Sequence, residues 1–236
     1  MRSIPSIFMS GLSFLVLLLV MGVALFATFL FAPAERVQGD VYRLLFVHVP
    51  SAWLAFFAFG VVAIGSVIYL IRRSPRWDRL AVASAELGVL FTTLALATGS
   101  IWGRNVWGVW WQWDPRLTTT LVMWFIYAGY LSLRAYTDDP EIKRRMSAVA
   151  GIVGVFSVPL VWFSVEWWRS LHPTPSVTSP GGGLPRDMLL TLLLCVAAFT
   201  VLYGIVVRQR MLLEQASSLA EDLTERLHAQ SERSDQ

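Results

Sequence analysis

The run LLFVHVPSAWLAFFAFGVVAIGSVIYLI, residues 44–71, contains a single ionisable side chain near neutral pH, that of His48. A helix that lies on a soluble core keeps one polar face toward water, and this run has none. About 20 predominantly apolar residues are enough to cross the hydrocarbon core of a bilayer, which is roughly 30 Å thick. We therefore interpret residues 44–71 as a membrane span.

Five further apolar runs accompany this one, and the charged residues gather between them. The six runs are approximately 7–31, 44–71, 81–101, 117–133, 146–165 and 188–207. Of the 236 residues, 15% are charged, against about a quarter in an ordinary soluble domain. The first run precedes an APA sequence at residues 32–34, but it is longer than the ~7–15 residues of a signal peptide's apolar region. The sequence predicts an all-α integral membrane protein with six transmembrane helices over residues 1–210.

Basic residues concentrate in alternate loops, namely at 72–79, at 134–145 and after residue 207. Each of the other three loops carries only two. Because Lys and Arg are enriched in cytoplasmic loops, both termini are expected in the cytoplasm and the loop after the third run is expected outside. The net charge of +3 therefore indicates topology, and nucleic acid is not an expected partner.

Residues 211–236 differ from the rest in composition, because apolar residues there recur at helical spacing between charged ones. We expect a cytoplasmic amphipathic tail, which is compatible with a helix on the membrane surface, a frayed end or a docking helix for a partner. The single cysteine, Cys195, excludes a disulfide within the chain. The sequence also lacks the Cys-x-x-Cys-His motif that attaches haem covalently in c-type cytochromes.

The loop after the third run reads WGRNVWGVWWQWDPRLT, residues 102–118. Tryptophans are common at membrane interfaces, but such a belt is spread over both interfaces, whereas these crowd on one. Two Trp-Gly pairs would let a flat ligand approach the backbone, and a helix here would spread the indoles over about half its circumference. A large, flat, apolar guest with a polar rim, such as haem, fits this surface. The tryptophans are Trp102, Trp107, Trp110, Trp111 and Trp113.

Two histidines lie on the same expected side as these tryptophans. His48 is at the outer end of the second run, and His172 is in the loop after the fifth. A single interfacial histidine is usually a solvated or capping residue. Two neutral imidazoles, however, can fill both axial positions of a haem iron, so the pair is the candidate metal-ligand set.

The charged residues of the same segment have two interpretations. Arg104 and Arg116 are suited to pair with the haem propionates, or they are ordinary interfacial arginines. Asp114 precedes Pro115 and is suited to cap the start of the fourth helix, or to orient Arg116.

Together these residues resemble the tryptophan-rich "WWD" signature of haem-handling membrane proteins in cytochrome c biogenesis. Six runs, with one outer histidine on each side of the signature, narrow the resemblance to the haem exporter protein C family, the C component of the bacterial System I machinery. It covers about residues 44–189, including HVPSAW and WWRSLHP. It implies axial ligation by His48 and His172, a haem platform, and a basic position at Arg116. The platform would be Trp102, Trp107, Trp111, Trp113 and Asp114.

The resemblance further implies a protein of the bacterial inner membrane that holds haem b transiently and presents it on the periplasmic face. Its partners would be a periplasmic haem chaperone (the E component), the A and B components of an ABC transporter, a small D component and the lipid bilayer. The expected activity is transfer rather than enzymatic turnover. An electron-transfer cytochrome b is one alternative, although its histidine pairs usually lie deep within helices. A membrane permease subunit is another, although it needs polar groups or broken helices near the midplane.

Overall fold

The computed structural model describes residues 10–172 and 183–234, and these residues are helical with no β-strand. A π-helical turn, η1 (Ala27–Phe31), continues the first helix, and a 3-10 turn, η2 (Asp40–Leu44), leads into the second. The α-helices are α1 (Gly11–Phe26), α2 (Leu45–Arg72), α3 (Pro75–Trp107), α4 (Pro115–Ala135), α5 (Pro140–Gly154), α6 (Ser157–Trp167) and α7 (Arg186–Ser234).

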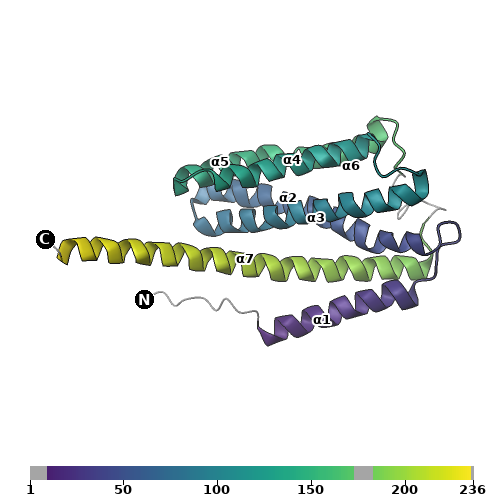
Figure 1. Ribbon diagram of the computed structural model, residues 1–236, viewed down its shortest axis with the longest axis horizontal. Coiled ribbons are helices and arrows are strands. Elements are labelled where there is room, and N and C mark those ends of the chain that lie inside the picture. Colours follow the sequence, from purple (N-terminus) through teal and green to yellow (C-terminus); the bar gives the residue numbers. More distant parts are fainter. Residues whose placement is uncertain (1–9, 173–182, 235–236) are drawn as a thin grey trace.

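The helices form a bundle with two chemically different ends (Figure 1). α2 and α3 make a hairpin at its centre, α4, α5 and α6 cover one side, and α7 followed by α1 covers the other. We call one end the tryptophan end; it contains residues 32–40, 99–114 and 168–172. The other is the arginine end; it contains residues 72–79, 134–145 and 204–215, and the last part of α7 projects beyond it.

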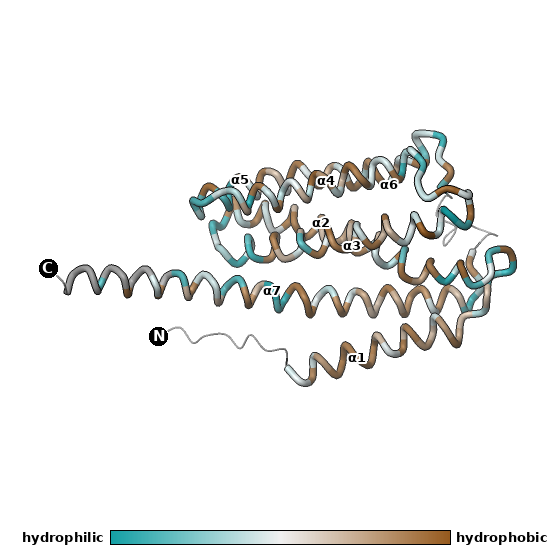
Figure 2. Tube along the Cα trace, in the orientation of Figure 1, coloured by the Kyte–Doolittle hydropathy of each residue, from teal (hydrophilic) through white to brown (hydrophobic). Residues whose placement is uncertain are grey.

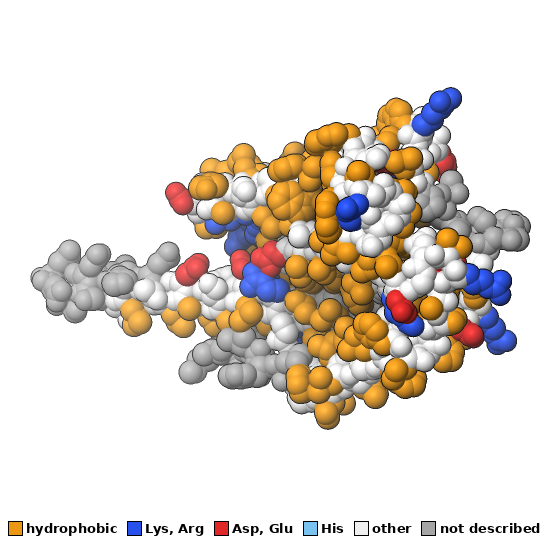
Figure 3. All heavy atoms as spheres, turned by 45° about the vertical axis from the view of Figure 1, so that its right-hand side comes forward, with side chains coloured by type: hydrophobic (Ala, Val, Ile, Leu, Met, Phe, Trp, Pro, Cys, Tyr) orange, Lys and Arg blue, Asp and Glu red, His pale blue; other side chains and the backbone are white. Residues whose placement is uncertain are grey.

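Within the described residues, five stretches are long and apolar enough to cross a membrane. They are Gly11–Phe31, Asp40–Arg72, Pro75–Trp107, Pro140–Trp167 and Arg186–Glu221, which contain five of the six expected runs from residue 10 onward. Their outward faces are apolar (Figures 2 and 3): on α1, for example, the side chains of Leu12, Leu15 and Leu19 are 73%, 63% and 68% exposed. Such a surface is stable only in contact with lipid or another apolar partner.

The fourth expected run forms α4, a helix of 21 residues that is not among these five. Three consecutive threonines, residues 118–120, and an arginine near each end make it less apolar than the others. α4 packs against α3, α5 and α6. A helix with so many protein neighbours exposes less surface to lipid and tolerates more polar residues. The six-span count stays a prediction.

The stretch from Pro140 to Trp167 is broken into α5 and α6 around Val155 and Phe156. Pro159 explains the position of the break. Its ring clashes with the carbonyl four residues earlier, that of Val155, and it has no N–H to donate there. Backbone hydrogen bonding resumes where the Val158 N–H donates to the Val155 carbonyl at 3.0 Å, and the Ser157 hydroxyl donates to the Gly154 carbonyl at 2.6 Å.

The main core lies where α2, α3 and α4 meet. The rings of Phe59 and Tyr127 are stacked, with centroids 3.5 Å apart and an interplanar angle of 9°. Gly88 on α3 makes this possible, because a Cβ there would lie 2.3 Å from the Phe59 ring. A second cluster joins α1, α2 and α7 around Phe46, Leu192 and other apolar residues. α1 is therefore attached to the bundle by its contact with α7, and not by direct packing against α3 or α4.

The expected boundary at residue 210 does not appear as a break in the backbone. α7 runs through it as one helix of 49 residues, so the tail of residues 211–236 continues the last span as far as the described chain extends, to Ser234. Its interpretation as a separate functional unit stays a prediction.

Candidate functional site

His48 lies in the first turn of α2, at the tryptophan end, and packs against α3. Its Nδ1 is 3.1 Å from the hydroxyl oxygen of Thr98, and its ring meets the indole of Trp102 edge-on at a centroid distance of 5.9 Å. A Cβ on Gly99 would lie 3.0 Å from its Cε1, so glycine at that position lets the imidazole lie close to the α3 backbone.

The Thr98 hydroxyl decides which ring nitrogen of His48 carries the proton. A hydroxyl has one proton to donate, and that of Thr98 is directed to the Leu94 carbonyl oxygen at 2.6 Å. Toward His48, Thr98 is therefore an acceptor, and Nδ1 is the donor. The neutral imidazole then keeps its lone pair on Nε2, and this tautomer is available for metal ligation.

Trp102 is held by two residues of the segment that precedes α2. Its Nε1 donates to the Gln38 amide oxygen at 2.7 Å, and Tyr42 meets it edge-on at 5.5 Å. Gln38 itself is held by its backbone N–H, which donates to the Glu35 carboxylate at 2.6 Å. Trp102 thus links residues 35–42 to His48, and it is a positioned side chain rather than a freely exposed indole.

Asp114 is buried, with 6% of the residue exposed, and it joins the end of the tryptophan segment to the loop that contains His172. It caps α4 by accepting from the Arg116 N–H at 2.9 Å. The Ser170 hydroxyl and the Leu171 N–H also donate to it, at 2.8 and 2.7 Å. Ser170 in turn accepts from the His172 N–H at 3.0 Å. One carboxylate therefore sets the position of the backbone at His172.

The two histidines and Arg116 come together at this end. Arg116, and His172 when it is protonated, both act electrostatically on the His48 ring. Arg116 donates through Nη2 to the Trp162 carbonyl at 2.9 Å, while its buried Nε has no hydrogen-bond partner within the described chain. A buried donor without a partner is costly, and an anionic group of a bound ligand would satisfy it. Arg104 also donates to a carbonyl, that of Gly108, but it is exposed and has no buried donor left without a partner among the described residues.

The tryptophan segment is only half helical, so the expectation of indoles around one helix is wrong beyond residue 107. α3 contains Trp102 and Trp107 and ends at Gly108, whose φ of 80° is a left-handed conformation that favours glycine. Trp110, Trp111 and Trp113 follow in an irregular loop; the first and last are 60% and 76% exposed. The loop is fastened to α3 by the Ser100 hydroxyl, which donates to the Trp110 carbonyl at 2.5 Å.

Several positioning residues were not predicted from the sequence, namely Gln38, Thr98, Gly99 and Ser170. Each is a common residue type that acts through one contact to a residue distant in the chain. Only Gly99 and Ser170 carried a signal, since both lie beside predicted site residues.

These features define a multi-pass, all-helical membrane protein with two histidines, an aromatic loop and a buried carboxylate at one end. A family model described as heme exporter protein C matches residues 5–224. The chain belongs to this family.

Curated relatives agree with this assignment. The chain is 43% identical over 173 residues to heme exporter protein C of Bradyrhizobium diazoefficiens, an alignment that covers 73% of this chain and 66% of that protein. It is 38% identical over 189 residues to heme exporter protein C of Haemophilus influenzae, covering 79% of this chain and 76% of the other. A ccmC-like mitochondrial protein from Marchantia polymorpha, named for cytochrome c biosynthesis, is 35% identical over 182 residues, 77% of each chain.

Proposed function

We propose that this protein binds haem through His48 and His172 at the tryptophan end and presents it to a haem chaperone during cytochrome c biogenesis. The observation that carries the proposal is the His48 imidazole, whose Nδ1 proton is held by Thr98 and whose Nε2 is left as a ligand. His172 acts on the same ring electrostatically. The names of the relatives, which refer to heme export and cytochrome c biosynthesis, support haem as the cargo.

The residues around the histidines suit the rest of the haem molecule. The exposed rings of Trp110 and Trp113 offer apolar faces to the macrocycle, and the unpartnered Nε of Arg116 is suited to a propionate. Arg104 is the weaker propionate candidate, because it is exposed and, unlike Arg116, has no buried nitrogen that lacks a partner within the described residues. Haem b would be held by coordination, stacking and the propionate contact, with no covalent bond to the chain, so that it can leave again; no catalytic residue is assigned.

The orientation follows from the distribution of charge. The basic residues of the arginine end favour the cytoplasm, which places both termini there and the tryptophan end on the periplasmic face of a bacterial inner membrane. In this arrangement α4 is the fourth of six spans. The E-component chaperone would dock at the tryptophan end, and the A, B and D components of an ABC-type complex would contact the membrane domain or the tail. Histidines at the end of the bundle also fit presentation better than electron transfer by a cytochrome b.

The test is to replace each ligand and record the optical spectrum of haem bound to the purified chain. In His48→Gly and His172→Gly, one axial position opens, so the bands characteristic of two-histidine ligation should be lost. Added imidazole should restore them in part by filling the vacancy. His228→Gly is the matched control, because α7 places residue 228 beyond the opposite end of the bundle.

An unchanged spectrum in both histidine variants would refute the ligand assignment. In contrast, Trp110→Ala and Trp113→Ala should keep the ligand spectrum and reduce transfer to the chaperone, since they contact the ring and not the iron. Full transfer by these variants at limiting haem would show that the two indoles only anchor the loop in the interface.

A further inference from the structure

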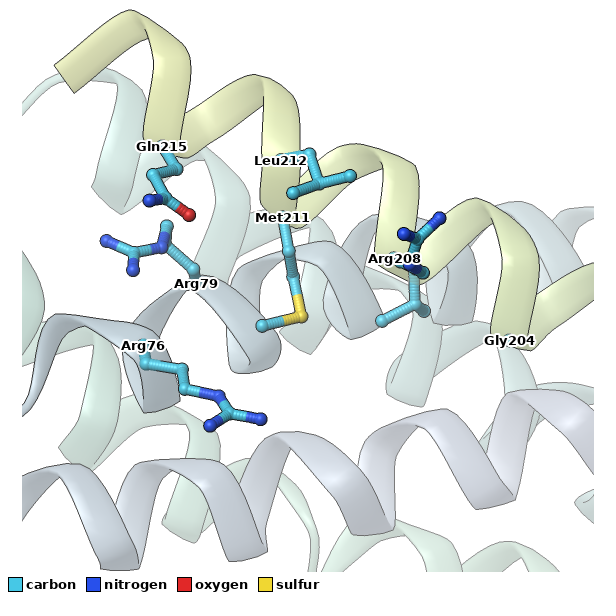
Figure 4. Close-up of a pocket in the computed structure, with 8 residues that line it drawn as sticks. Arg76, Arg79, Gly204, Arg208, Met211, Leu212 and Gln215 are labelled. Carbon is cyan, nitrogen blue, oxygen red and sulfur yellow. The ribbon is translucent and has the colours of Figure 1, made fainter. Parts of the chain in front are cut away.

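A pocket at the arginine end lies between the first turns of α3 and the middle of α7 (Figure 4). Its volume is about 400 Å³. The lining residues are Arg76, Arg79, Gly204, Val207, Arg208, Met211, Leu212 and Gln215. It is far from the two histidines, and neither haem ligation nor chaperone docking uses it.

The pocket combines three positive charges with an apolar wall. Within the described residues, no carboxylate lies within 4.0 Å of the guanidinium nitrogens of Arg76, Arg79 or Arg208. Asp78 and Glu214 act on Arg79 electrostatically, but neither forms an ion pair with it. The guanidinium groups are therefore available to an anion from outside the chain.

Not every arginine at this end has a guanidinium group that is available to an external anion. Arg210, two residues after Arg208, donates twice to the Glu86 carboxylate, at 2.6 Å each. This ion pair joins α7 to α3 and fixes the two walls of the pocket relative to each other. Arg208 lies about 200° away around the same helix, and it faces the pocket.

The pocket spans the boundary between hydrocarbon and headgroups. From Met188 to Gly204 a helix rises roughly 24 Å, so Gly204 and Val207 lie near the far edge of a core about 30 Å thick. Arg208 follows at the level of the headgroups, and Gln215 lies about 10 Å further along the helix. Gly204 also leaves space, since a Cβ built there would meet no atom within 4 Å.

We propose that this pocket binds one anionic phospholipid, with its phosphate among Arg76, Arg79 and Arg208 and an acyl chain along Gly204, Val207 and Met211. Charge complementarity selects the headgroup, because basic pockets between transmembrane helices attract anionic lipids. The apolar wall below the arginines favours a lipid over a free anion, because only a lipid has an acyl chain that can pack against it.

The experiment is native mass spectrometry of the full-length chain, titrated in separate arms with phosphatidylglycerol, phosphatidylcholine, inorganic phosphate and haem. We expect phosphatidylglycerol to bind at least about ten-fold more tightly than phosphatidylcholine. Each of Arg76→Gln, Arg79→Gln and Arg208→Gln should weaken it about five-fold, at roughly the contribution of one basic residue near the surface. Arg72→Gln is the matched control, because Arg72 is exposed at the same end but does not line the pocket.

Gly204→Leu tests the acyl-chain part without changing charge. It should weaken phosphatidylglycerol binding while the unfolding temperature of the lipid-free protein stays at or above that of the wild type, because leucine favours a helix more than glycine does. Equal binding of both lipids, or a preference retained after all three arginines are replaced, would overturn the proposal. If inorganic phosphate competes with phosphatidylglycerol equally strongly, the pocket is a site for free anions. If haem does so, the pocket is a site for the cargo, and either result would overturn the proposal.

Discussion

The two ends of the bundle are held by different chemistry. At the arginine end, the Arg134 guanidinium donates twice to the Asp78 carboxylate, at 2.6 and 3.0 Å, and both residues are more than 90% buried. At the tryptophan end the buried carboxylate, Asp114, has no arginine at ion-pair distance within the described residues and is satisfied by the Ser170 hydroxyl and backbone N–H groups. The first arrangement joins two helices, and the second joins two loops.

This difference shows how one small bundle can be rigid at one end and receptive at the other. Charged pairs fix the helices where the loops are short and basic. Hydrogen bonds from hydroxyl, amide and backbone groups hold the loops of the tryptophan end while leaving the rings of Trp110 and Trp113 exposed. The proposed haem would then meet preformed surfaces without breaking an ion pair.

The largest expected effect is at the arginine end. Asp78→Ala leaves the Arg134 guanidinium buried without its partner, which should lower the free energy of unfolding by about 3–5 kcal/mol. Denaturant titration of the purified protein, followed by circular dichroism, measures this. Asp40→Asn is the control, because Asp40 pairs with Arg43 at a surface position where it is 79% exposed, and its loss should change little. Equal destabilisation by the two variants would contradict the contrast between the ends.

At the tryptophan end, Asp114→Asn should act locally. Asparagine still caps α4, but one acceptor oxygen becomes a donor and faces the groups that now donate to it. Each lost hydrogen bond to the carboxylate should cost about 1.5–3 kcal/mol. Hydrogen exchange at Leu171 and His172 should accelerate, while the helices around Asp78 stay protected. Unchanged exchange at these two amides would show that Asp114 does not hold the loop.

Thr98→Val tests the tautomer of His48. Valine has nearly the same shape but cannot accept from Nδ1, so haem affinity should fall about 10–100-fold, as is usual when the hydrogen-bond partner of a ligand is removed. Thr98→Ser keeps the hydroxyl and should bind normally in the same absorbance titration. If the two variants bind equally, the hydroxyl has no such role, whether or not His48 is a ligand.

The smallest expected effect is a dependence on pH in residues 35–39. The backbone N–H groups of Gln38 and Val37 donate to the Glu35 carboxylate and lower its pKa below the ordinary value of 4.5. The ionised carboxylate therefore stabilises this turn above pH 4.5. The stabilisation is lost as the pH falls through the pKa that Glu35 has in the folded protein. Exchange protection of the Val37 amide, corrected for intrinsic rates, should therefore drop in acid. Glu35→Gln should remove the pH dependence, and a persistent drop would assign it elsewhere.

The membrane helices were predictable because an apolar run of 20 residues rarely forms any structure other than a membrane span. A hydropathy pattern ends a predicted span at the first charged residue, but the hydrogen bonds of the helix continue past it. α3 therefore extends to Trp107 and ends only at Gly108. α4 shows the opposite limit, since the hydroxyls of Thr119 and Thr120 donate to carbonyls of their own helix, which a hydropathy pattern does not take into account. The break at Val155 follows from Pro159.

The site was predictable as a set of residue types but not as a set of contacts. Histidine, tryptophan and aspartate are conspicuous in an apolar chain, so His48, Trp102 and Asp114 could be singled out. Their partners Thr98, Gln38 and Ser170 are small or common, and helices are full of threonines that bond only to their own backbone. Which one faces a histidine depends on how α2 and α3 pack, and this is a tertiary property.

The length of α7 has a mechanical consequence. Its 49 residues extend about 74 Å, more than twice the thickness of the hydrocarbon core. Arg210, held by Glu86, divides it into two arms of equal length, because 210 − 186 and 234 − 210 are both 24. The first arm packs against α1, α2 and α3, whereas the last part of the second projects beyond the bundle (Figure 1). One unbroken helix therefore joins a segment that the bundle leaves uncovered to residues packed in its core.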